Sequence, residues 1–467
     1  MRARARLLLP TLCFVAGAPC VVSVAHGQQA ARPSRPAFES LRFREDWSAA
    51  PSGDALDPLK HIALSDGGVA WLSFGGHVRV RGESDRNFLG GGAGTRTDAF
   101  VAVRTHLHAD LHLGTHLRGF VEGRFADVAG RELPGGARPI DRDRGDLGNA
   151  FVELGGTMHG VRAAARVGRQ ELLLGRERII SPLDWANVRR VFEGAAVEAR
   201  RASLVVSAFS LHPLTLRPLR RDVADDAARL WGTTAAWQPP RGGRIFEAAL
   251  LVKSLDGVGT APASKRSTAT ARLVTPLTRP DIVLELEGGA QQVNVGGNTT
   301  YATMIVSDLT WSPKRRWSPA FTLGLDRASG TRAGEAAQSG TWDQLYPLAH
   351  AYAGYADALG RRNLVEERVV AQFSPTATAR IRTAAHAFQR ASTADASYDV
   401  TGAVFRASRA GSSRDVGAEV DVTLQWRLGR HLRLDGGVAR FAPGDFLRET
   451  GSARQYSWFF SSLTATF

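Results

Sequence analysis

Histidines, arginines and acids occupy nearly every second position of VRTHLHADLHLGTHLRGFVEGR, residues 103–124, and mostly small or apolar residues separate them. A period of two predicts β-strands with one polar and one apolar face, and Gly114-Thr115 predicts the turn of a hairpin. His106, His108 and His112 share the polar face, where imidazoles two residues apart can bind a metal. A polar lining is the commoner use of such a face, so we expect no metal site.

Other catalytic patterns are weak in this chain. It contains no HExxH pair and no P-loop, and GGGAG at 90–94 does not open a strand-to-helix turn, as a dinucleotide site requires. Serines are numerous, but no pattern pairs them with His212, His350 or His386. We therefore expect neither an enzyme nor a cofactor, although a barrel hydrolase and a secreted β-rich carbohydrate-binding protein remain alternatives.

The first 27 residues predict export. Arginines at positions 2, 4 and 6 precede an apolar run that ends in Ala25-His26-Gly27, as in a cleaved signal peptide. Both cysteines, Cys13 and Cys20, lie within it, so the mature chain has no disulfide or thiolate metal site. The net charge of the whole chain is +14, but an exported chain without an RNA- or DNA-binding module is not expected to bind nucleic acid.

Residues 28–66 lack sustained periodicity and predict an irregular N-terminal segment. Eighteen alternating segments follow in residues 67–467. They are expected at 70–83, 99–113, 116–126, 149–155, 161–171, 191–200, 202–211, 229–238, 244–253, 266–275, 281–290, 300–312, 319–327, 364–373, 377–389, 413–427, 431–441 and 454–467.

The links between these segments alternate in length. Gly114-Thr115 and 428–430 are short, whereas 127–148, 172–190 and 328–363 are long. Short periplasmic turns and long extracellular loops are typical of a transmembrane antiparallel β-barrel of the bacterial outer membrane. Tryptophans beside the short turns and an aromatic C-terminal residue, Phe467, agree with this all-β fold.

A barrel of about 18 strands is too wide for side chains to fill, so the polar faces should line a lumen. By parity the lumen receives Arg79, Arg81, Arg104, Arg118, Arg124, Arg162, Arg166, Arg380 and Arg382. The counter-charges are Glu83, Asp110, Glu122, Glu285, Glu287, Glu419 and Asp421. Rings of arginine select anions, because the guanidinium fork matches a carboxylate and keeps its charge.

The stretch RVGRQELLLGRERIISPLDWANVRRVFEGAAV, residues 166–197, resembles the most recognisable segment of the alginate export family, as do residues 341–364 and the hairpin. The resemblance implies an eighteen-strand outer-membrane barrel that passes an acidic exopolysaccharide through an arginine-rich constriction. The matching positions are Arg104, Arg118, Glu122, Arg166, Arg169, Gln170, Glu171, Arg178, Asn187, Arg189 and Arg190. Arg169 and Glu171 have lipid-facing parity and are expected at the rim, after a bulge or in the loop.

The function expected is diffusion of anions through the lumen, with an acidic polysaccharide such as alginate as the first candidate. A general or small-carboxylate anion porin is the alternative. The partners expected are outer-membrane lipid, the anion itself and periplasmic export proteins. One departure from the family is the short link 428–430, where the alginate exporter has a long periplasmic turn that plugs the pore.

Overall fold

The computed structural model describes most of the mature chain. Its described residues are 36–49, 51, 53–88, 97–132, 136–239, 243–257 and 262–467. The predicted signal peptide, residues 1–27, and the GGGAG stretch lie outside them. Within the described residues, no helix is both long enough and apolar enough to cross a membrane.

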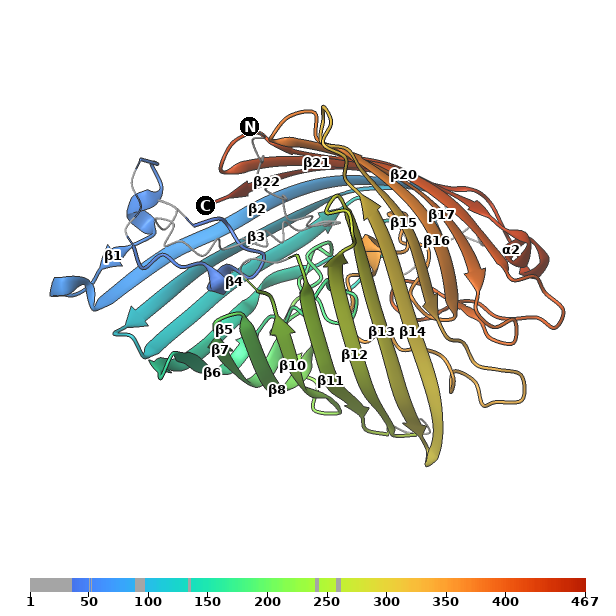
Figure 1. Cartoon of the computed structure of the whole chain (residues 1–467), viewed down its shortest axis with the longest axis horizontal. Helices are drawn as coiled ribbons and strands as arrows, with labels where there is room; N and C mark the ends of the chain where they lie inside the picture. Colours follow the sequence, from blue (N-terminus) through green and yellow to red (C-terminus); the bar gives the residue numbers. More distant parts are fainter. Residues whose placement is uncertain are drawn as a thin grey trace, which may run out of the picture.

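The strands form one closed antiparallel barrel (Figure 1). The sheet has 20 strands, but β1 (Ile62–Ala63) and β9 (Val223–Ala224) are two-residue additions, which leaves the 18 barrel strands that the sequence predicted. These are β2 (Ala70–Arg86), β3 (Asp98–Leu113), β4 (Leu117–Ala129), β5 (Asp143–Met158), β6 (Val161–Gln170), β7 (Phe192–Arg201), β8 (Leu204–Thr215), β10 (Ala228–Trp237), β11 (Ile245–Leu255), β12 (Ser264–Pro276), β13 (Ile282–Val295), β14 (Asn298–Trp311), β15 (Ala320–Ala328), β16 (Leu364–Phe373), β17 (Ala379–Arg390), β20 (Asp415–Arg427), β21 (Leu432–Pro443) and β22 (Tyr456–Thr466).

Each strand pairs with its neighbour in sequence, and β2 closes the ring on β22 with His77 opposite Thr466. The predicted strand bounds are close to those observed, except that β5 begins at Asp143, six residues earlier than predicted. The short links lie at one end of the barrel, which we call the short-turn end, and the long links at the long-loop end. One link at the long-loop end is short, because Gly296 and Gly297 join β13 to β14 with positive φ angles of 55° and 86°.

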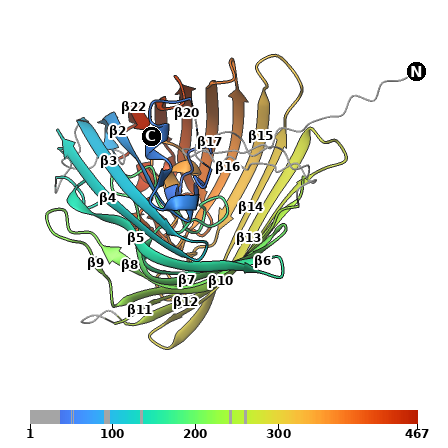
Figure 2. The same cartoon turned by 90° about the vertical axis from the view of Figure 1, so that its left-hand side faces the viewer.

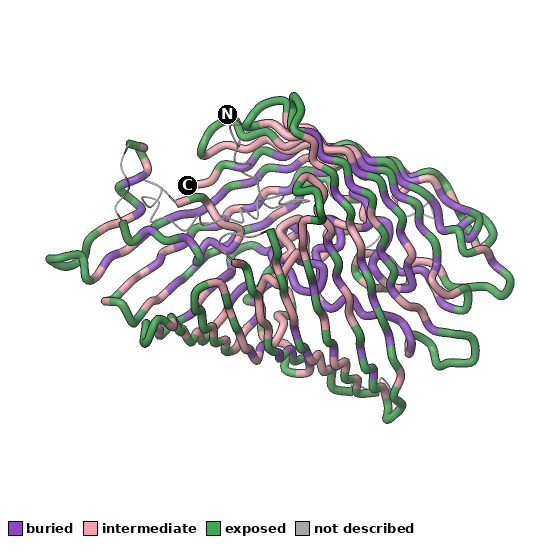
Figure 3. The backbone as a smooth tube through the Cα atoms, in the orientation of Figure 1, coloured by how far each residue is buried: buried purple, intermediate pink, exposed green. Residues whose placement is uncertain are grey.

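Burial alternates along the strands as the parity predicted (Figure 3). Outward positions expose a belt of large apolar side chains, such as Leu250 at 64%, Leu323 at 61% and Val369 at 55% exposure. Trp237, Trp311, Trp317 and Trp426 are also exposed, beside the short turns. This outer surface is apolar where a soluble protein would be polar, because it faces lipid.

Two long links turn into the ring. Residues 171–191, here called the motif loop, and residues 329–363, the tyrosine loop, bring Ile180 and Trp342 into an apolar cluster with Phe192 and Leu251 of the wall. The only helices described in and around the ring are short. They are η1 (Arg42–Arg44), η2 (Asp57–Leu59), η3 (Asp66–Gly68), η4 (Ala349–Ala351) and α2 (Asp445–Thr450), and a small ladder pairs β18 (Ser397–Tyr398) with β19 (Val404–Arg406).

The N-terminal segment, residues 36–61, lies in the mouth of the barrel at the short-turn end (Figure 2). Phe43 packs edge-on against Phe120 and Phe151 of the inner wall, with centroid distances of 6.0 and 5.3 Å. Arg42 donates to the carbonyl oxygens of Gly76 at 3.1 Å and Phe467 at 2.8 Å. This segment therefore covers part of the mouth and joins the two strands that close the ring.

Candidate functional site

The motif loop and the tyrosine loop form one layer across the lumen. The amide of Tyr346 donates to the carbonyl of Ile179 at 2.9 Å, and the amide of Ser181 donates to the carbonyl of Tyr346 at 2.8 Å. Arg190 adds a bond from its guanidinium to the same Tyr346 carbonyl at 2.6 Å. Because two of these bonds join backbone to backbone and the third comes from the Arg190 guanidinium, the two loops act as one constriction.

Three predicted lumen arginines hold the motif loop from the β2–β3 wall. Arg79 donates to the carbonyls of Asp184 at 2.8 Å and Ala186 at 2.9 Å. Arg104 donates to the same two carbonyls at 2.9 and 3.1 Å. Arg81 bonds the carbonyl of Trp185 and lies over its ring, 4.1 Å from the centroid. All three side chains are buried, so they act mainly as anchors of the loop.

Charge reinforces these anchors. The Asp184 carboxylate accepts from Arg104 at 2.7 Å and also pairs with Arg189, which bonds Glu171 at 2.5 Å. Burial opposes ionisation of Asp184, but Arg104 and Arg189 outweigh it and hold its pKa well below the ordinary 3.8. The loop is therefore fixed by a buried network in which Arg104 and Arg189 share the Asp184 carboxylate, while Arg79 bonds only backbone carbonyls.

Asn187 fixes the same loop without charge. Its side-chain amide donates to the carbonyls of Val103, Asp127 and Asp141, each at 3.0 Å. The residue is 2% exposed, so these carbonyls have no ready replacement donor from water. The asparagine of the predicted motif is thus a clamp between the loop and strands β3 and β4.

Arg178 reaches the opposite wall. It pairs with Glu285 at 2.5 Å, Glu287 at 2.7 Å and Asp308 at 2.9 Å. Burial alone would lower the pKa of Arg178, but the carboxylates and Tyr352 raise it well above its ordinary value. The motif loop therefore spans the lumen from β3 to β13 and β14 with a charged contact at each side.

Below Arg178, on the side of the short turns, the wall and both loops enclose a cavity of about 60 Å³, here called the lumenal pocket. It is lined by Arg176, Arg178, Glu285, Asp308, Thr310, Thr322, Ala351, Tyr352, Arg368, Val370, Gln372 and Arg382. Four arginines thus meet two carboxylates, two threonines and a tyrosine ring. Arg382 pairs with Asp421 at 2.7 Å and keeps 14% of its side chain exposed.

The remaining predicted residues of the hairpin form ion pairs along the wall. Arg118 bonds Asp110 at 2.7 Å, Arg166 bonds Glu153 at 2.6 Å, and Glu122 lies 3.2 Å from His106. Arg118 also donates to the Phe43 carbonyl at 2.6 Å, so it helps to hold the N-terminal segment. Arg162 is exposed at the short-turn end.

The parity argument left Arg169 and Glu171 uncertain, and the structure places both of them and the intervening Gln170. Arg169 lies at the rim, where it contacts Asp146 at 3.3 Å and Glu193 at 3.4 Å. Glu171 begins the motif loop and turns inward to Arg189. Gln170 is buried at the end of β6 and donates to the carbonyls of Gly168 and Gly194 at 3.4 Å.

These features match the family model for alginate export, which covers residues 70–460. The chain belongs to the alginate export family. The predicted resemblance is therefore confirmed. No curated protein sequence matches the chain.

Solved structures of outer-membrane porins share the fold of this family member. A BenF-like porin from Pseudomonas fluorescens Pf-5 aligns with a TM-score of 0.58 and 10% identity over 85% of this chain and 98% of its own. OccK8 (OprE) from Pseudomonas aeruginosa aligns with a TM-score of 0.57 and 9% identity over 85% of this chain and 98% of its own. OpdK from Pseudomonas aeruginosa, solved with vanillate, aligns with a TM-score of 0.55 and 13% identity over 84% of this chain and 98% of its own.

Family and fold together identify an outer-membrane channel rather than an enzyme. The two alternatives of another class, a barrel hydrolase and a secreted carbohydrate-binding protein, are set aside on that ground. Within the alginate export family this chain has a short late turn, since only residues 428–431 join β20 to β21.

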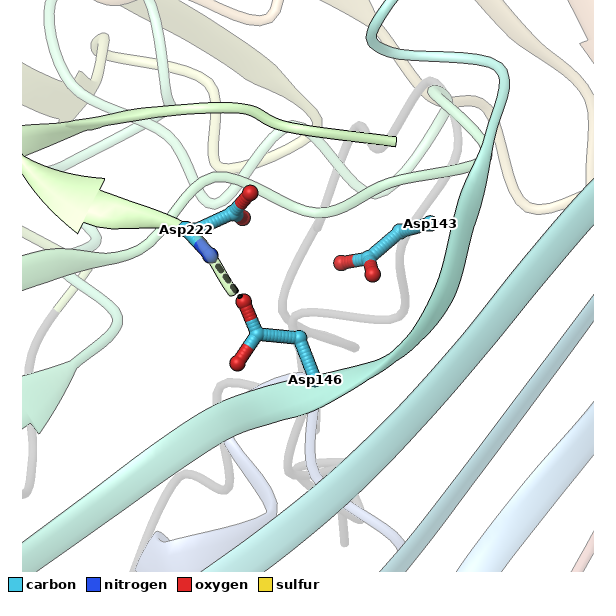
Figure 4. A group of neighbouring side chains, drawn as sticks. All are labelled: Asp143, Asp146 and Asp222. Carbon is cyan, nitrogen blue, oxygen red and sulfur yellow. Dashed lines mark hydrogen bonds between the residues drawn. The ribbon is translucent and has the colours of Figure 1, made fainter. Parts of the chain in front are cut away.

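One acidic cluster of this family member has the composition of a metal site. Asp143, Asp146 and Asp222 bring carboxylate oxygens within 4.8 Å of one another, and the amide of Asp222 donates to Asp146 at 2.5 Å (Figure 4). Arg124 bonds both Asp143, at 2.6 Å, and Asp222, and Arg169 reaches Asp146. Two guanidinium groups thus offset two of the three carboxylate charges, and the cluster is an ion-pair network.

Sequence reasoning missed part of the lumenal pocket. Arg368 has the lumen-facing parity of β16 and was available to the same argument that selected Arg382. Arg176 and Tyr352 lie in loops, where parity carries no information. The N-terminal segment was predicted only as irregular, and no pattern in it indicated that Phe43 and Trp47 would be buried in the barrel mouth.

Proposed function

We propose that this outer-membrane channel passes carboxylate-bearing solutes by diffusion, with an acidic polysaccharide of the alginate type as the first candidate. The observation that carries the proposal is the lumenal pocket, where Arg176, Arg178, Arg368 and Arg382 converge beneath the constriction. A guanidinium has five N–H donors, and one carboxylate partner uses at most two of them. Arg176 and Arg382 each have a single described carboxylate partner, so donors of these two arginines remain for a carboxylate of the solute.

The acids of the pocket suit a channel better than a tight binding site. Arg368 bonds Asp308 and lies 3.1 Å from Glu366, and Arg176 lies 3.4 Å from Glu285. A solute carboxylate must compete with these fixed partners, which weakens its binding. Conduction requires binding that is favourable enough to admit the solute and weak enough to release it.

A small-carboxylate porin is the second candidate, and the size of the pocket favours it. A cavity of about 60 Å³ under a hydrogen-bonded double loop is narrow for a sugar chain, and polymer passage requires the loops to move. One structural neighbour, OpdK, was solved with vanillate, an aromatic carboxylate. In this chain Tyr352, with Arg178 4.6 Å above its ring centroid, supplies an aromatic and cationic surface.

Single-channel block in planar bilayers tests the proposal. An oligouronate should reduce current through the purified protein at concentrations where a neutral oligosaccharide of equal length does not. The block should weaken with salt, because exposed charges are screened within about 10 Å at 0.1 M. Vanillate serves as the third probe, and a block by vanillate without one by oligouronate would assign the channel to small carboxylates.

Matched variants locate the effect. Arg382→Ala should raise the blocking concentration several-fold. Arg279→Ala should not change it, because Arg279 lies in the short turn between β12 and β13 and its ion-pair partner among the described residues is Asp281. Equal block by charged and neutral sugars would make this a general pore and overturn the proposal.

The route to the membrane completes the proposal. We infer that residues 1–27 are a cleaved signal peptide, so the mature protein should begin after Gly27. N-terminal sequencing of protein from isolated outer membranes checks this. A chain that keeps its first residues would contradict cleavage but leave the channel assignment untouched.

A further inference from the structure

A second pocket lies outside the lumen, at the long-loop end. It encloses about 310 Å³ and is called here the rim pocket. It is lined by Thr303, Arg327, Ser329, Gly330, Arg332, Ala391, Ser392, Thr393 and Arg414. None of these residues lines the lumenal pocket, so the two pockets are separate.

Strand parity places the rim pocket on the outer face of the barrel. Arg327 shares its side of β15 with Leu323 and Leu325, which are 61% and 45% exposed. Thr303 shares its side of β14 with Ile305, which is 54% exposed. The pocket therefore sits at the upper edge of the apolar belt, where a membrane changes from acyl chains to headgroups.

Its walls are fixed by buried hydrogen bonds. The side-chain amide of Asn363, a residue 1% exposed, donates to the Ser392 carbonyl at 3.0 Å and accepts from the Ser392 amide at 2.6 Å. The hydroxyl of Ser392 donates to the Thr331 carbonyl at 2.6 Å. Ser392, at the base of the loop after β17, is thus bonded to both the end and the start of the tyrosine loop, and the pocket is preformed.

The charge of the rim pocket is unbalanced, in contrast to the lumen. Arg327 and Arg332 are exposed, and within the described part of the chain their guanidinium groups have no carboxylate within ion-pair distance. Arg414 donates to the carbonyls of Arg390 at 3.1 Å and Ala391 at 3.2 Å, which orients its guanidinium without neutralising it. The described lining contains no carboxylate but four hydroxyl side chains.

We propose that the rim pocket binds the phosphate headgroup of a membrane lipid. Three uncompensated arginines, together with the hydroxyls of Thr303 and Thr393, match the charge and the several acceptor oxygens of a phosphate monoester. The exposed leucines and isoleucine directly below it lie where the acyl chains of the same lipid would run. A free anion would use the arginines but not this apolar surface.

Native mass spectrometry of the full-length protein in detergent tests the proposal. The probes are a phosphatidic acid, the diacylglycerol with the same acyl chains, and inorganic phosphate. Phosphatidic acid should remain bound, and the double variant Arg327→Ala/Arg332→Ala should reduce its affinity roughly tenfold, since each lost pair contributes modestly at an exposed site. Diacylglycerol should not bind above background.

Arg229→Ala is the matched control. Arg229 is also exposed near the long-loop end of its strand, but its described partner is the hydroxyl of Ser210. Its substitution should leave phosphatidic acid binding unchanged, and heat-modifiable migration confirms folding of all variants. Equal loss in the control variant, or equal binding of diacylglycerol, would overturn the proposal. If inorganic phosphate displaces phosphatidic acid when the two are present at equal concentration, the lipid assignment is overturned and this is a free-anion site.

Discussion

The two sides of the lumen hold arginines in different surroundings. On the β2–β3 side, Arg79 and Arg104 end on carbonyl oxygens and a carboxylate of the motif loop. On the β16–β17 side, Arg368 and Arg382 pair with acids of their own wall and line the lumenal pocket. The first group builds the constriction, and the second faces the space that a solute can enter.

The difference teaches that facing the lumen is not the same as being available to a solute. Both groups have the same residue type and the same parity on neighbouring strands. What separates them is whether a loop from elsewhere in the chain uses their donors. Substitutions on the two sides should therefore change different measurable properties of the channel.

The largest effect is expected from Asp184→Ala. It leaves Arg104 and Arg189 without their shared carboxylate, and breaking a buried pair of this kind costs about 3–5 kcal/mol. The motif loop should detach, so single-channel conductance should rise several-fold and a protease should cleave within residues 172–190. Asp184→Asn keeps a hydrogen-bond acceptor, so its conductance should lie between those of the wild type and Asp184→Ala. An unchanged conductance would show that the loop is held by Asn187 and backbone contacts alone.

A smaller effect is expected from Asn187→Ala on the same side. The buried carbonyl of Asp141 and the half-buried carbonyls of Val103 and Asp127 lose their donor, and an unsatisfied buried group costs about 1–3 kcal/mol before relaxation. The barrel should unfold at lower urea concentration, while conductance in the folded protein changes less than with Asp184→Ala. Equal urea midpoints for variant and wild type would remove Asn187 from the loop anchors.

Charge reversal separates the two sides directly. Arg382→Glu should lower the preference of the channel for chloride over potassium, because it adds a negative charge to the lumenal pocket. Arg104→Glu instead faces Asp184 and should raise conductance by repelling the loop. Reversal potentials in a salt gradient measure the first effect. If Arg104→Glu shifts the reversal potential and Arg382→Glu does not, the assignment of the two sides is reversed.

The smallest effect concerns the N-terminal segment, which lies at the short-turn end beside strands β2 and β3. Burial, and then the neighbouring charge of Arg42, lower the pKa of Lys60 to about 8, against partial compensation from Glu45 and Asp57. The docked segment thus binds fewer protons than the released one. Docking should strengthen as pH rises from about 8 toward the ordinary 10.5 of lysine, and this contribution should be lost as pH falls through 8.

Hydrogen exchange of residues 36–61, corrected for intrinsic rates, measures that docking between pH 7 and 10. Lys60→Met is the control, because it keeps the apolar stem and removes the titration. Protection in the wild type that falls with rising pH would contradict the expected sign.

The barrel could be predicted from sequence because lipid imposes a period of two on every strand. Val420 and Val422 alternate with Asp421 and Thr423 so regularly that the sequence pattern predicts the bounds of β20. The site could be predicted only in part. Parity placed Arg104 in the lumen, but its contact with Asp184 joins residues 80 positions apart through a loop without periodicity. Likewise no local pattern relates Arg178 to Glu285, 107 positions away.

The position of Arg42 has a consequence for the order of assembly. The pairing of β2 with β22 joins residues near the two ends of the chain, with the amide of Gly76 donating to Phe467 at 2.9 Å and the amide of Phe467 donating back at 3.0 Å. Contacts so distant in sequence form late, because the chain entropy lost in bringing them together is large. Arg42 bonds both carbonyls of that pair, so its two hydrogen bonds can form together only after β2 has paired with β22. The segment of the mature chain that is synthesised first therefore completes the fold last.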